Sequence, residues 1–433
     1  KLYDQALVNY REIGNRLGEA NALSRLGDVR RVQDDHAGAE KFYQQALEIY
    51  HEIGNRLGEA KTLHRLGNVR WVQNDHVGAE RLYQEALPAY LEAGDRLGQA
   101  HALKNLGDVK EVQSEYAAAE RFYQQALQIY GETGDRLGEA NTFRSLGDMK
   151  RMQNDYVEAE GLHRQALLIY QEISHRLGEA NVLGSLGDVM TAQNKYADAE
   201  RFYQQALAIF HEIGNRLGEA NILKGLGDVK KMQSEYGDAE GLYQQALAIY
   251  REIGIRSGQA NTLQGLGDAK AVQSNYVEAG RLYQQALAIY REIGNRLGEA
   301  NALDGLGDVK RMQDDYVEAE RLYQQALPIY GEIGSRLGEA NALQRLGDVK
   351  RMQSDNAEAE ALYLRALGIY SALDDRYSQG TTLLSMVEVY KALSASQKAR
   401  SSARRARELL VPFPKLVERC DKLLQQLGST GIV

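Results

Sequence analysis

Hydrophobic positions along the chain follow a helical period that breaks and restarts at regular intervals. Within residues 296–335, one apolar stripe recurs every three or four residues, and a second stripe follows after a short polar break. The first stripe comprises Leu297, Ala300, Leu303, Leu306, Val309 and Met312, and the second comprises Tyr316, Ala319, Leu322, Tyr323, Ala326, Leu327, Tyr330 and Ile333. The pattern predicts two amphipathic helices, called helix A and helix B below.

The same 40-residue unit recurs along almost the whole chain. Leu-Gly pairs stand at 26–27, at 66–67 and at every fortieth residue up to 346–347, without insertion or deletion. Nine units begin with arginine, at Arg16, Arg56, Arg96, Arg136, Arg176, Arg216, Arg256, Arg296 and Arg336. Such a period is typical of stacked supersecondary units, so we expect an all-α solenoid of antiparallel helix pairs.

Capping residues mark where the helices begin and end. Asp315 is followed three residues later by Glu318, which is the spacing of a capping box at the start of helix B. Gly294 suits the left-handed residue that ends a helix, and Asn295 can cap the next helix. These signals recur in most units and predict short turns between all helices.

Small residues stand where two helices must approach closely, at Ala300 and Gly307 in helix A and at Ala319 and Ala326 in helix B. Leu-Gly in the first helix, followed by Ala, an aromatic residue and Ala in the second, resembles the tetratricopeptide repeat (TPR). The fit is to the 40-residue kind found in kinesin light chains, Pins-type adaptors and the sensor regions of NLR-like (STAND) ATPases. The resemblance implies a right-handed TPR superhelix whose A helices line a concave groove.

The two ends of the chain depart from the repeat. Residues 1–15 match only helix B, so we expect a truncated first repeat, a longer protein and a missing N-terminal domain. Nine tandem units then fill residues 16–375. Residues 376–433 predict a divergent terminal repeat and, after Pro412 and Pro414, a C-terminal capping helix.

Composition excludes several classes of function. The formal net charge is -8 and the pI is about 5.7, which disfavours nucleic acid as a partner. The single cysteine, Cys420, allows no internal disulfide, and no apolar run or signal peptide is present, so we expect a cytoplasmic protein without a membrane partner. No metal-ligand spacing, phosphate loop or nucleophile elbow occurs, so we expect no enzyme activity, cofactor or metal.

Two polar positions of helix A are nearly constant and face the expected groove. The Asn series comprises Asn21, Asn141, Asn181, Asn221, Asn261, Asn301 and Asn341, and the Asp series comprises Asp28, Asp108, Asp148, Asp188, Asp228, Asp268, Asp308 and Asp348. An amide can hold the backbone of an extended peptide, and carboxylates favour basic partners. A structural role, such as pairing with nearby Lys or Arg or bridging adjacent units, would produce the same constancy.

Three other positions of helix A vary among the units. The first variable position holds Ser24, His64, Lys104, Arg144, Gly184, Lys224, Gln264, Asp304 and Gln344. The second variable position holds Arg25, Arg65, Asn105, Ser145, Ser185, Gly225, Gly265, Gly305 and Arg345. The third variable position holds Arg31, Trp71, Glu111, Arg151, Thr191, Lys231, Ala271, Arg311 and Arg351. Variation on a fixed frame is typical of a recognition surface, although exposed positions also drift freely. Trp71 is either an anchoring contact or a half-buried filler.

These observations define a candidate groove for a protein or an extended peptide segment. Its proposed residues are Asn141, Asn181, Asn221, Asn261, Asn301, Asp148, Asp188, Asp228, Asp268, Asp308, His64, Lys104, Arg144, Lys224, Asn105, Trp71, Arg151, Lys231 and Arg311. We expect a non-catalytic binding scaffold, and the resemblance further suggests the sensor region of a larger NLR-like signalling ATPase. Two alternatives stay open: a helical-repeat nucleic-acid binder, and a consensus-like array without a specific ligand.

Overall fold

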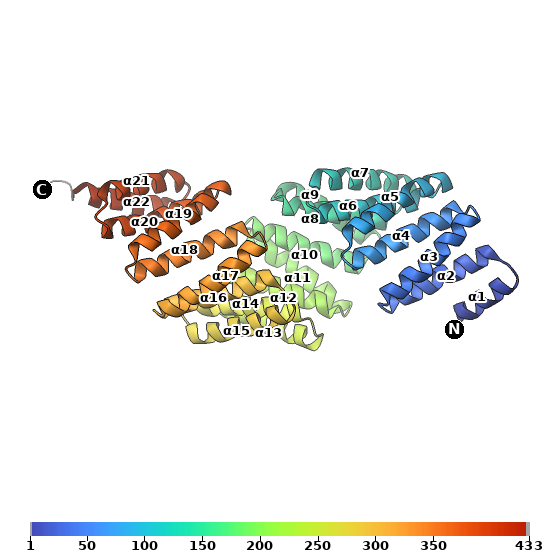
Figure 1. Cartoon of the computed structure of the whole chain (residues 1–433), viewed down its shortest axis with the longest axis horizontal. Helices are drawn as coiled ribbons and strands as arrows, with labels where there is room; N and C mark the ends of the chain where they lie inside the picture. The colour runs from blue at the N-terminus through green and yellow to red at the C-terminus, as the bar shows by residue number, and fades with distance from the viewer. Residues whose placement is uncertain (1, 430–433) are drawn as a thin grey trace. The chain divides into compact units, whose positions relative to one another are not determined.

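The computed structural model describes residues 2–429, which form 22 α-helices and no strand (Figure 1). Lys1 and residues 430–433, which belong to the expected first and terminal repeats, lie outside the described residues. The chain divides into two compact units, Lys1–Gly214 (unit 1) and Asn215–Val433 (unit 2), and each is described by itself.

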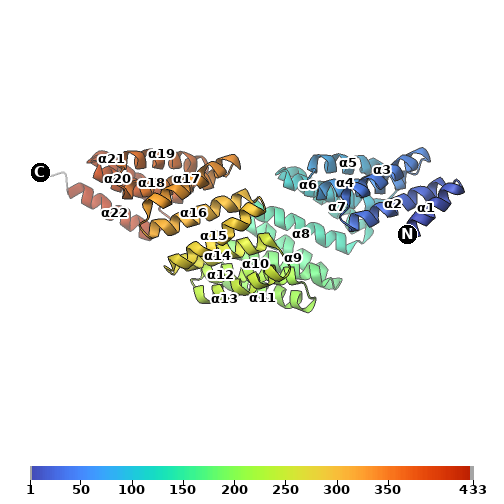
Figure 2. The ribbon, with the colours of Figure 1, turned by 60° about the horizontal axis from the view of Figure 1, so that its bottom comes forward.

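Helices alternate as the sequence predicts. Unit 1 contains α1 (Leu2–Glu12), α2 (Arg16–Val32), α3 (His36–Glu52), α4 (Arg56–Val72), α5 (His76–Ala93), α6 (Arg96–Val112), α7 (Tyr116–Thr133), α8 (Arg136–Met152), α9 (Tyr156–Glu172), α10 (Arg176–Ala192) and α11 (Tyr196–Glu212). Unit 2 contains α12 (Arg216–Met232), α13 (Tyr236–Glu252), α14 (Arg256–Val272), α15 (Tyr276–Glu292), α16 (Arg296–Met312), α17 (Tyr316–Glu332), α18 (Arg336–Met352), α19 (Asn356–Ala372), α20 (Arg376–Ala392), α21 (Ser396–Leu409) and α22 (Pro414–Ser429). Each helix A packs against the following helix B, and successive pairs stack within each unit (Figures 1 and 2). The expected α-solenoid is confirmed.

The turns use Gly294 and Asn295 as the sequence predicts. Asn295 Oδ1 accepts from the Gly298 backbone N–H at 2.8 Å, and Gly294 has a φ of +69°. The capping box is only half formed, because Asp315 Oδ1 accepts from the Glu318 N–H at 3.3 Å but the Glu318 carboxylate accepts from Arg321 at 2.7 Å. The turn from helix A to helix B has a feature that the sequence did not predict, because Asp314, which is not glycine, has a φ of +60°. Asp, Asn or Ser takes this left-handed position in every such turn between residues 34 and 394, and these short polar side chains tolerate it better than most.

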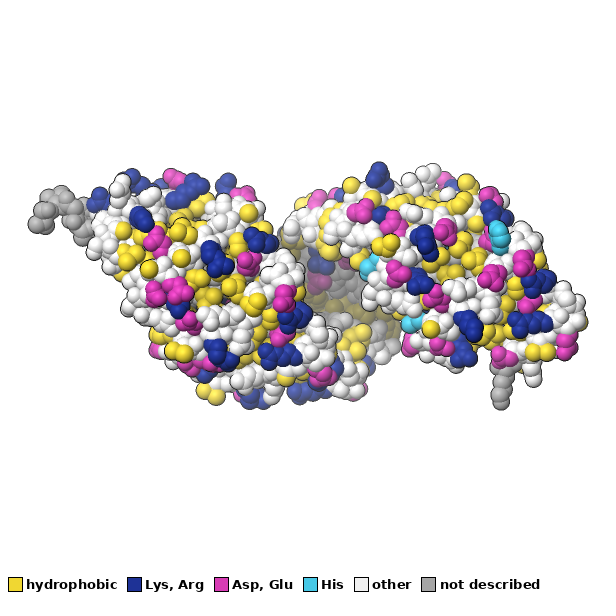
Figure 3. All heavy atoms as spheres, viewed as in Figure 1, with side chains coloured by type: hydrophobic (Ala, Val, Ile, Leu, Met, Phe, Trp, Pro, Cys, Tyr) yellow, Lys and Arg dark blue, Asp and Glu magenta, His cyan; other side chains and the backbone are white. Residues whose placement is uncertain are grey.

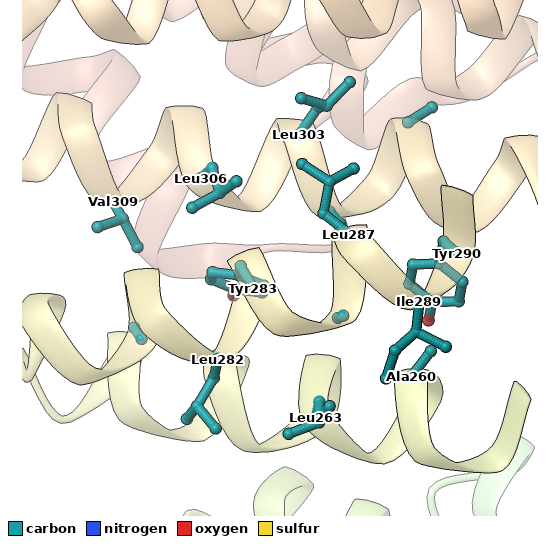
Figure 4. Close-up of a cluster of buried hydrophobic side chains, with 14 of the residues drawn as sticks. Ala260, Leu263, Leu282, Tyr283, Leu287, Ile289, Tyr290, Leu303, Leu306 and Val309 are labelled. Carbon is teal, nitrogen blue, oxygen red and sulfur yellow. The ribbon is translucent and has the colours of Figure 1, made fainter. Parts of the chain in front are cut away.

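The core lies between the helices of each pair and between neighbouring pairs. Figure 4 shows part of it in unit 2, where Leu303, Leu306 and Val309 of α16 belong to one buried cluster with Tyr283 and Leu287 of α15. The apolar stripe of helix A is shorter than the sequence predicts. Leu297 and Met312, in the first and last turns of α16, are about half exposed, at 48% and 50%. Packing therefore uses only the middle of helix A.

Ion pairs join the ends of the helices within a repeat. Arg296, at the start of α16, contacts Glu299 one turn later at 2.6 Å and Glu332 at the end of α17 at 2.6 Å. The same pairing with both glutamates occurs at Arg16, Arg56, Arg136, Arg176 and Arg216. Charges of both signs are accordingly interspersed over the face shown in Figure 3.

A second set of ion pairs joins consecutive repeats. Lys270 of α14 contacts Glu240 of α13 at 2.6 Å, and Lys350 of α18 contacts Glu320 of α17 at 2.7 Å. Gly280 stands where α15 would supply the equivalent glutamate. Lys310 contacts Asp315 in its own repeat instead, at 3.3 Å.

The C-terminal helices share a core of their own. α22 packs against α21, and buried side chains from α19 to α22 form one cluster that includes Tyr363, Met386, Leu410, Cys420 and Leu427. The helix break expected at Pro412 and Pro414 is present, since α21 ends at Leu409 and α22 begins at Pro414. None of the helices within residues 2–429 combines the length and apolarity needed to cross a bilayer.

Candidate functional site

The Asn series is hydrogen-bonded to tyrosines of helix B in the same repeat. In the repeat formed by α16 and α17, the Tyr330 hydroxyl donates to Asn301 Oδ1 at 2.8 Å. The same bond, at 2.6 to 2.7 Å, joins Tyr50 to Asn21, Tyr170 to Asn141, Tyr250 to Asn221, Tyr290 to Asn261 and Tyr370 to Asn341. Asn181 has no such partner, because Phe210 stands at the tyrosine position.

This bond fixes which end of the amide is available to a ligand. Oδ1 accepts from the tyrosine, so Nδ2 remains as a pair of donors. Burial raises the pKa of Tyr330 to about 12, and the charge of Asp308 adds to the shift, so the hydroxyl keeps its proton and donates. Asn261 is exposed and Asn301 is half-buried. The Asn series therefore presents amide donors on the polar side of helix A.

The Asp series accepts from a second tyrosine of helix B, 15 residues further along the chain. Tyr323 donates to Asp308 Oδ1 at 2.8 Å. Equivalent bonds of 2.6 to 2.8 Å join Tyr43 to Asp28, Tyr83 to Asn68, Tyr123 to Asp108, Tyr203 to Asp188, Tyr243 to Asp228, Tyr283 to Asp268 and Tyr363 to Asp348. At Asp148 the partner is His163, whose Nε2 lies 3.6 Å from Oδ1, beyond hydrogen-bond distance. Each carboxylate thus has a contact inside its own repeat.

The tyrosine rings pack on glycines of helix A. A Cβ atom at Gly307 would lie 2.5 Å from the Tyr323 ring, and one at Gly338, in the first turn of α18, would lie 2.4 Å from the Tyr330 ring. Tyr323 therefore joins the two helices of one repeat, whereas Tyr330 also contacts the next repeat. Both rings are buried.

Pairing of the Asp series with neighbouring cations, considered above as a structural role, is present in several repeats. Lys104 contacts Asp108 at 2.7 Å, and Lys224 contacts Asp228 at 2.7 Å. Arg144 lies 3.2 Å from Asp148 in the same way. These cations stand at the first variable position, so this position forms ion pairs with the Asp series.

The second variable position connects consecutive repeats in unit 1. Arg65 of α4 donates to Ser24 Oγ of α2 at 2.6 Å, and its Nε lies 3.2 Å from Asp28 Oδ1. Asn105 of α6 lies 3.0 Å from His64 and 3.2 Å from Asn68 of α4. Side chains at this position thus fill the space beside the first variable position and the Asp position of the preceding repeat.

Glycine leaves this space open in unit 2. Gly265 of α14 and Gly305 of α16 stand at the second variable position, and two adjacent cavities lie beside them. The Lys224 cavity, of about 290 Å³, is lined by Lys224, Asp228, Lys231, Asn261, Gln264, Gly265, Asp268, Tyr290, Asn295, Leu297, Gly298 and Asn301. The Asp304 cavity, of about 370 Å³, is lined by Gln264, Asp268, Tyr283, Asn301, Asp304, Gly305, Asp308, Tyr330, Ser335, Leu337, Gly338, Asn341 and Arg345.

The cavities bring part of the sequence-predicted groove together. Seven of its residues line one or both cavities: Asn261, Asn301, Asp228, Asp268, Asp308, Lys224 and Lys231. Two other candidates of unit 2, Asn221 and Arg311, line neither of them. The remaining candidates lie on A helices of unit 1: Asn141, Asn181, Asp148, Asp188, His64, Lys104, Arg144, Asn105, Trp71 and Arg151. Their binding role stays a prediction.

Sequence reasoning missed the apolar wall of the cavities. Leu297 lines the Lys224 cavity and Leu337 lines the Asp304 cavity, and they are 48% and 49% exposed. Their regular spacing placed them in the packing frame. Their place in the first turn of helix A could have distinguished these leucines from core residues, because the core is formed by the middle turns of that helix.

Trp71 packs between repeats instead of standing free in a groove. It is partly buried against a cluster that contains Tyr83, Leu106 and Val109. Its ring makes an edge-to-face contact with the His76 ring, and the two ring centroids are 5.0 Å apart. His64, on the same helix, is surrounded closely enough for burial to lower its pKa to about 4, with nearby positive charges adding to the shift. Both residues contribute to packing in unit 1.

The described residues contain no group of three or more His, Cys, Asp or Glu side chains arranged to hold a metal ion. The side chains that line the two cavities supply amide donors, carboxylates, ammonium or guanidinium groups and leucine surface. Such a surface can bind polar and charged groups of an extended chain.

Comparison with known proteins gives the family. The family model described as tetratricopeptide repeat matches residues 1–52, 18–92, 58–132, 98–172, 138–212, 178–252 and 258–332. No curated protein matches the sequence.

Several solved structures share the fold at low sequence identity. One is a STAND protein with a tetratricopeptide repeat sensor from Pyrococcus horikoshii, 16% identical, with a TM-score of 0.55 over 78% of this chain and 54% of that chain. Aspartyl phosphate phosphatase F from Bacillus subtilis is 15% identical, with a TM-score of 0.56 over 82% of this chain and 93% of its own. The apo quorum sensor NprR from B. thuringiensis is 13% identical, with a TM-score of 0.55 over 83% and 99%.

Proposed function

Because the chain belongs to the tetratricopeptide repeat family, we propose that it is a non-catalytic scaffold that binds an extended peptide segment of a partner protein. The binding surface is the A-helix side of unit 2, where the Lys224 and Asp304 cavities adjoin. One observation carries the proposal: the two cavities share Gln264, Asp268 and Asn301 as lining residues. A single extended segment can therefore enter both.

The lining matches the groups of a peptide. The Nδ2 groups of Asn261 and Asn301 are donors for backbone carbonyls, because a tyrosine holds the other end of each amide. Leu297 and Leu337 offer apolar surface to side chains, and the carboxylates beside them favour basic groups. Repeated acidic side chains also oppose a nucleic-acid backbone, which makes the peptide the better supported ligand.

The wider setting of this scaffold is a second part of the proposal. The shared fold with the sensor of a STAND protein and with a quorum sensor supports a sensor region in a larger NLR-like signalling ATPase. We further propose that the protein is cytoplasmic. We also propose that residues 376–433 form a divergent terminal repeat and a capping helix.

Peptide selection tests the binding surface. A displayed library of random peptides is selected on the immobilised chain, and the dissociation constants of recovered peptides are measured by fluorescence anisotropy. In the variant Asn301→Asp, Oδ1 still accepts from Tyr330 but the Nδ2 donors are lost. We expect peptide binding to weaken about tenfold, as for the loss of a hydrogen bond to a buried partner.

A matched control separates this effect from the added negative charge. Gln284, exposed on helix α15, lines neither cavity, so Gln284→Glu should leave peptide affinity unchanged. Equal affinities for Asn301→Asp and the unaltered chain would remove the Asn series from the binding surface. Recovery of single-stranded RNA in place of peptides, at low salt, would favour the nucleic-acid alternative.

A further inference from the structure

The residues that line the Asp304 cavity carry a net negative charge. Its lining contains three carboxylates, from Asp268, Asp304 and Asp308, and one guanidinium, from Arg345, which gives a formal charge of -2. Lys231 lies 2.9 Å from Asp268 and Arg311 lies 3.2 Å from Asp308, but neither cation lines the cavity.

Asp304, which lines this cavity, has one carboxylate oxygen without a hydrogen-bond partner. The residue is 7% exposed; its Oδ2 accepts from Arg345 of the next repeat, and its Oδ1 is buried without a hydrogen-bond partner. Asp304 is also the only acidic residue at the first variable position of the nine units. A buried carboxylate oxygen without a donor is costly, so a donor from a ligand would be strongly favoured.

The chain itself shows which group fits this kind of space. In unit 1, the Arg65 guanidinium lies between Ser24 and Asp28 of the preceding repeat. In unit 2, the Arg345 guanidinium lies in the same way between Asp304 and Asp308, 3.2 Å from the latter. A guanidinium is therefore the natural complement of a first variable position and its neighbouring Asp.

At the step from α14 to α16 this complement is missing. Gly305 stands where Arg65 and Arg345 stand in their repeats, and the space beside Gln264 and Asp268 belongs to the Asp304 cavity. The glycine also packs closely, since a Cβ atom there would lie 2.9 Å from the Tyr283 ring. The Asp304 cavity therefore opens at a position where an arginine stands in other repeats, and Gln264, Asp268 and Asp304 are among its lining residues.

We propose that the Asp304 cavity binds the guanidinium group of an arginine side chain in the partner segment. The guanidinium donates to Asp304 Oδ1 and to Gln264 and Asp268, and it takes the place that an arginine of the chain fills at other steps. Its planar set of donors can serve several acceptors at once, which an ammonium group cannot do in the same geometry. The assignment rests on the proposed peptide-binding function and names one side chain of the peptide.

Small probes test the cavity without knowledge of the partner. The full chain is titrated with N-acetyl-L-arginine amide, with the neutral citrulline analogue and with the lysine analogue, and binding is followed by NMR at the amides of Gly305 and Asn341. We expect the arginine probe to bind about tenfold more tightly than either of the others. Equal binding of the arginine and citrulline probes, or of the arginine and lysine probes, would overturn the assignment.

Two variants locate the probe. Asp304→Asn removes the charge, and Gly305→Arg supplies a guanidinium of the chain itself, so both should weaken arginine binding about tenfold. Asp348→Asn is the charge-matched control, because Asp348 lines neither cavity and Asn68 makes the same tyrosine bond elsewhere. Unchanged binding by Asp304→Asn would overturn the assignment even if Gly305→Arg did not fold.

The outcomes separate this inference from the proposed function. Arginine binding that depends on Asp304, together with a failure to select any peptide, would retain the cavity and reject the peptide scaffold. Selected peptides that bind through Asn301 and tolerate replacement of every arginine by citrulline would retain the scaffold and reject the guanidinium site.

Discussion

The Tyr323 ring packs on Gly307 while its hydroxyl donates to Asp308, the very next residue of α16. One side chain of helix B thus makes an apolar and a polar contact with two adjacent residues of helix A. This explains why Leu-Gly-Asp is nearly constant among the repeats. The glycine gives room to the ring, and the aspartate satisfies the buried hydroxyl.

Replacing Gly307 by alanine should destabilise unit 2. The new Cβ atom would lie 2.5 Å from the Tyr323 ring, so the helices must move apart. We expect a loss of about 2 kcal/mol, measured as a shift in the urea midpoint by circular dichroism. Gly241 is the control, since nothing lies within 4 Å of its Cβ position, and Gly241→Ala should stabilise α13 by about 0.5 to 1 kcal/mol. Similar effects at both sites would contradict the packing argument.

Phe210→Tyr should stabilise unit 1. The new hydroxyl would reach Asn181 as Tyr170 reaches Asn141 in an equivalent repeat, where the bond measures 2.7 Å. Phe210 is only 3% exposed, so the added group needs this partner. We expect a gain of about 1 kcal/mol in the free energy of unfolding, and Tyr170→Phe should cost a similar amount. A loss of stability in Phe210→Tyr would show that Asn181 does not accept the hydroxyl.

Stability should fall in weak acid because of His163. Burial lowers the pKa of His163 to about 4, against the partly opposing charge of Asp148. The unfolded chain binds a proton near pH 6.5 and the folded chain near pH 4, so stability is complete above pH 6.5 and is lost as the pH falls toward 4. The loss amounts to roughly 3 kcal/mol for this residue. His64 adds a similar effect.

The variant His163→Tyr isolates this contribution. Tyrosine at this position donates to Asp in repeats such as those of Tyr123 and Tyr323, so the variant should be more stable by about 1 kcal/mol at neutral pH. Its unfolding free energy should also change less between pH 6.5 and 4. Tyr123→His is the reverse change in the preceding repeat and should steepen the pH profile. Parallel profiles for all three proteins would exclude His163 as the source.

Gly280→Glu should strengthen the joint between the repeats of α14/α15 and α16/α17. A Cβ atom there meets only Val309 at 3.7 Å, so a side chain fits. We expect about 1 kcal/mol from helix propensity and a further gain of about 0.5 kcal/mol from an ion pair with Lys310. Gly280→Ala measures the first part alone. The difference between the two variants should disappear at high salt, and a difference that persists would argue against the ion pair.

Much of the fold could be predicted from the sequence because its signals are local. The capping residues, the 40-residue period and the stripe from Ala300 to Val309 depend only on nearby residues, and Gly294 marks a turn by its backbone freedom. The left-handed Asp314 was not predicted because short polar side chains occupy many conformations. Its position becomes informative only when the turn is seen.

The candidate site was less predictable because its contacts join distant residues. Asn301 and Tyr330 are 29 residues apart, and nothing in either helix alone indicates that they bond. The Asn series could be found in the sequence because it is nearly constant among the repeats. Constancy alone does not show that each amide has a tyrosine partner. The cavities exist because Gly265 and Gly305 have no side chains. A sequence pattern does not show whether neighbouring helices fill the space that a glycine leaves.

The shared walls of the two cavities limit how far the repeats behave as independent modules. Gln264, Asp268 and Asn301 each border both spaces, so under the proposed function one substitution there would alter recognition at two successive ligand positions. A single transplanted repeat would therefore bring only part of the lining of each cavity that it borders. Under the same proposal, a new specificity in unit 2 would require the exchange of repeats in overlapping pairs.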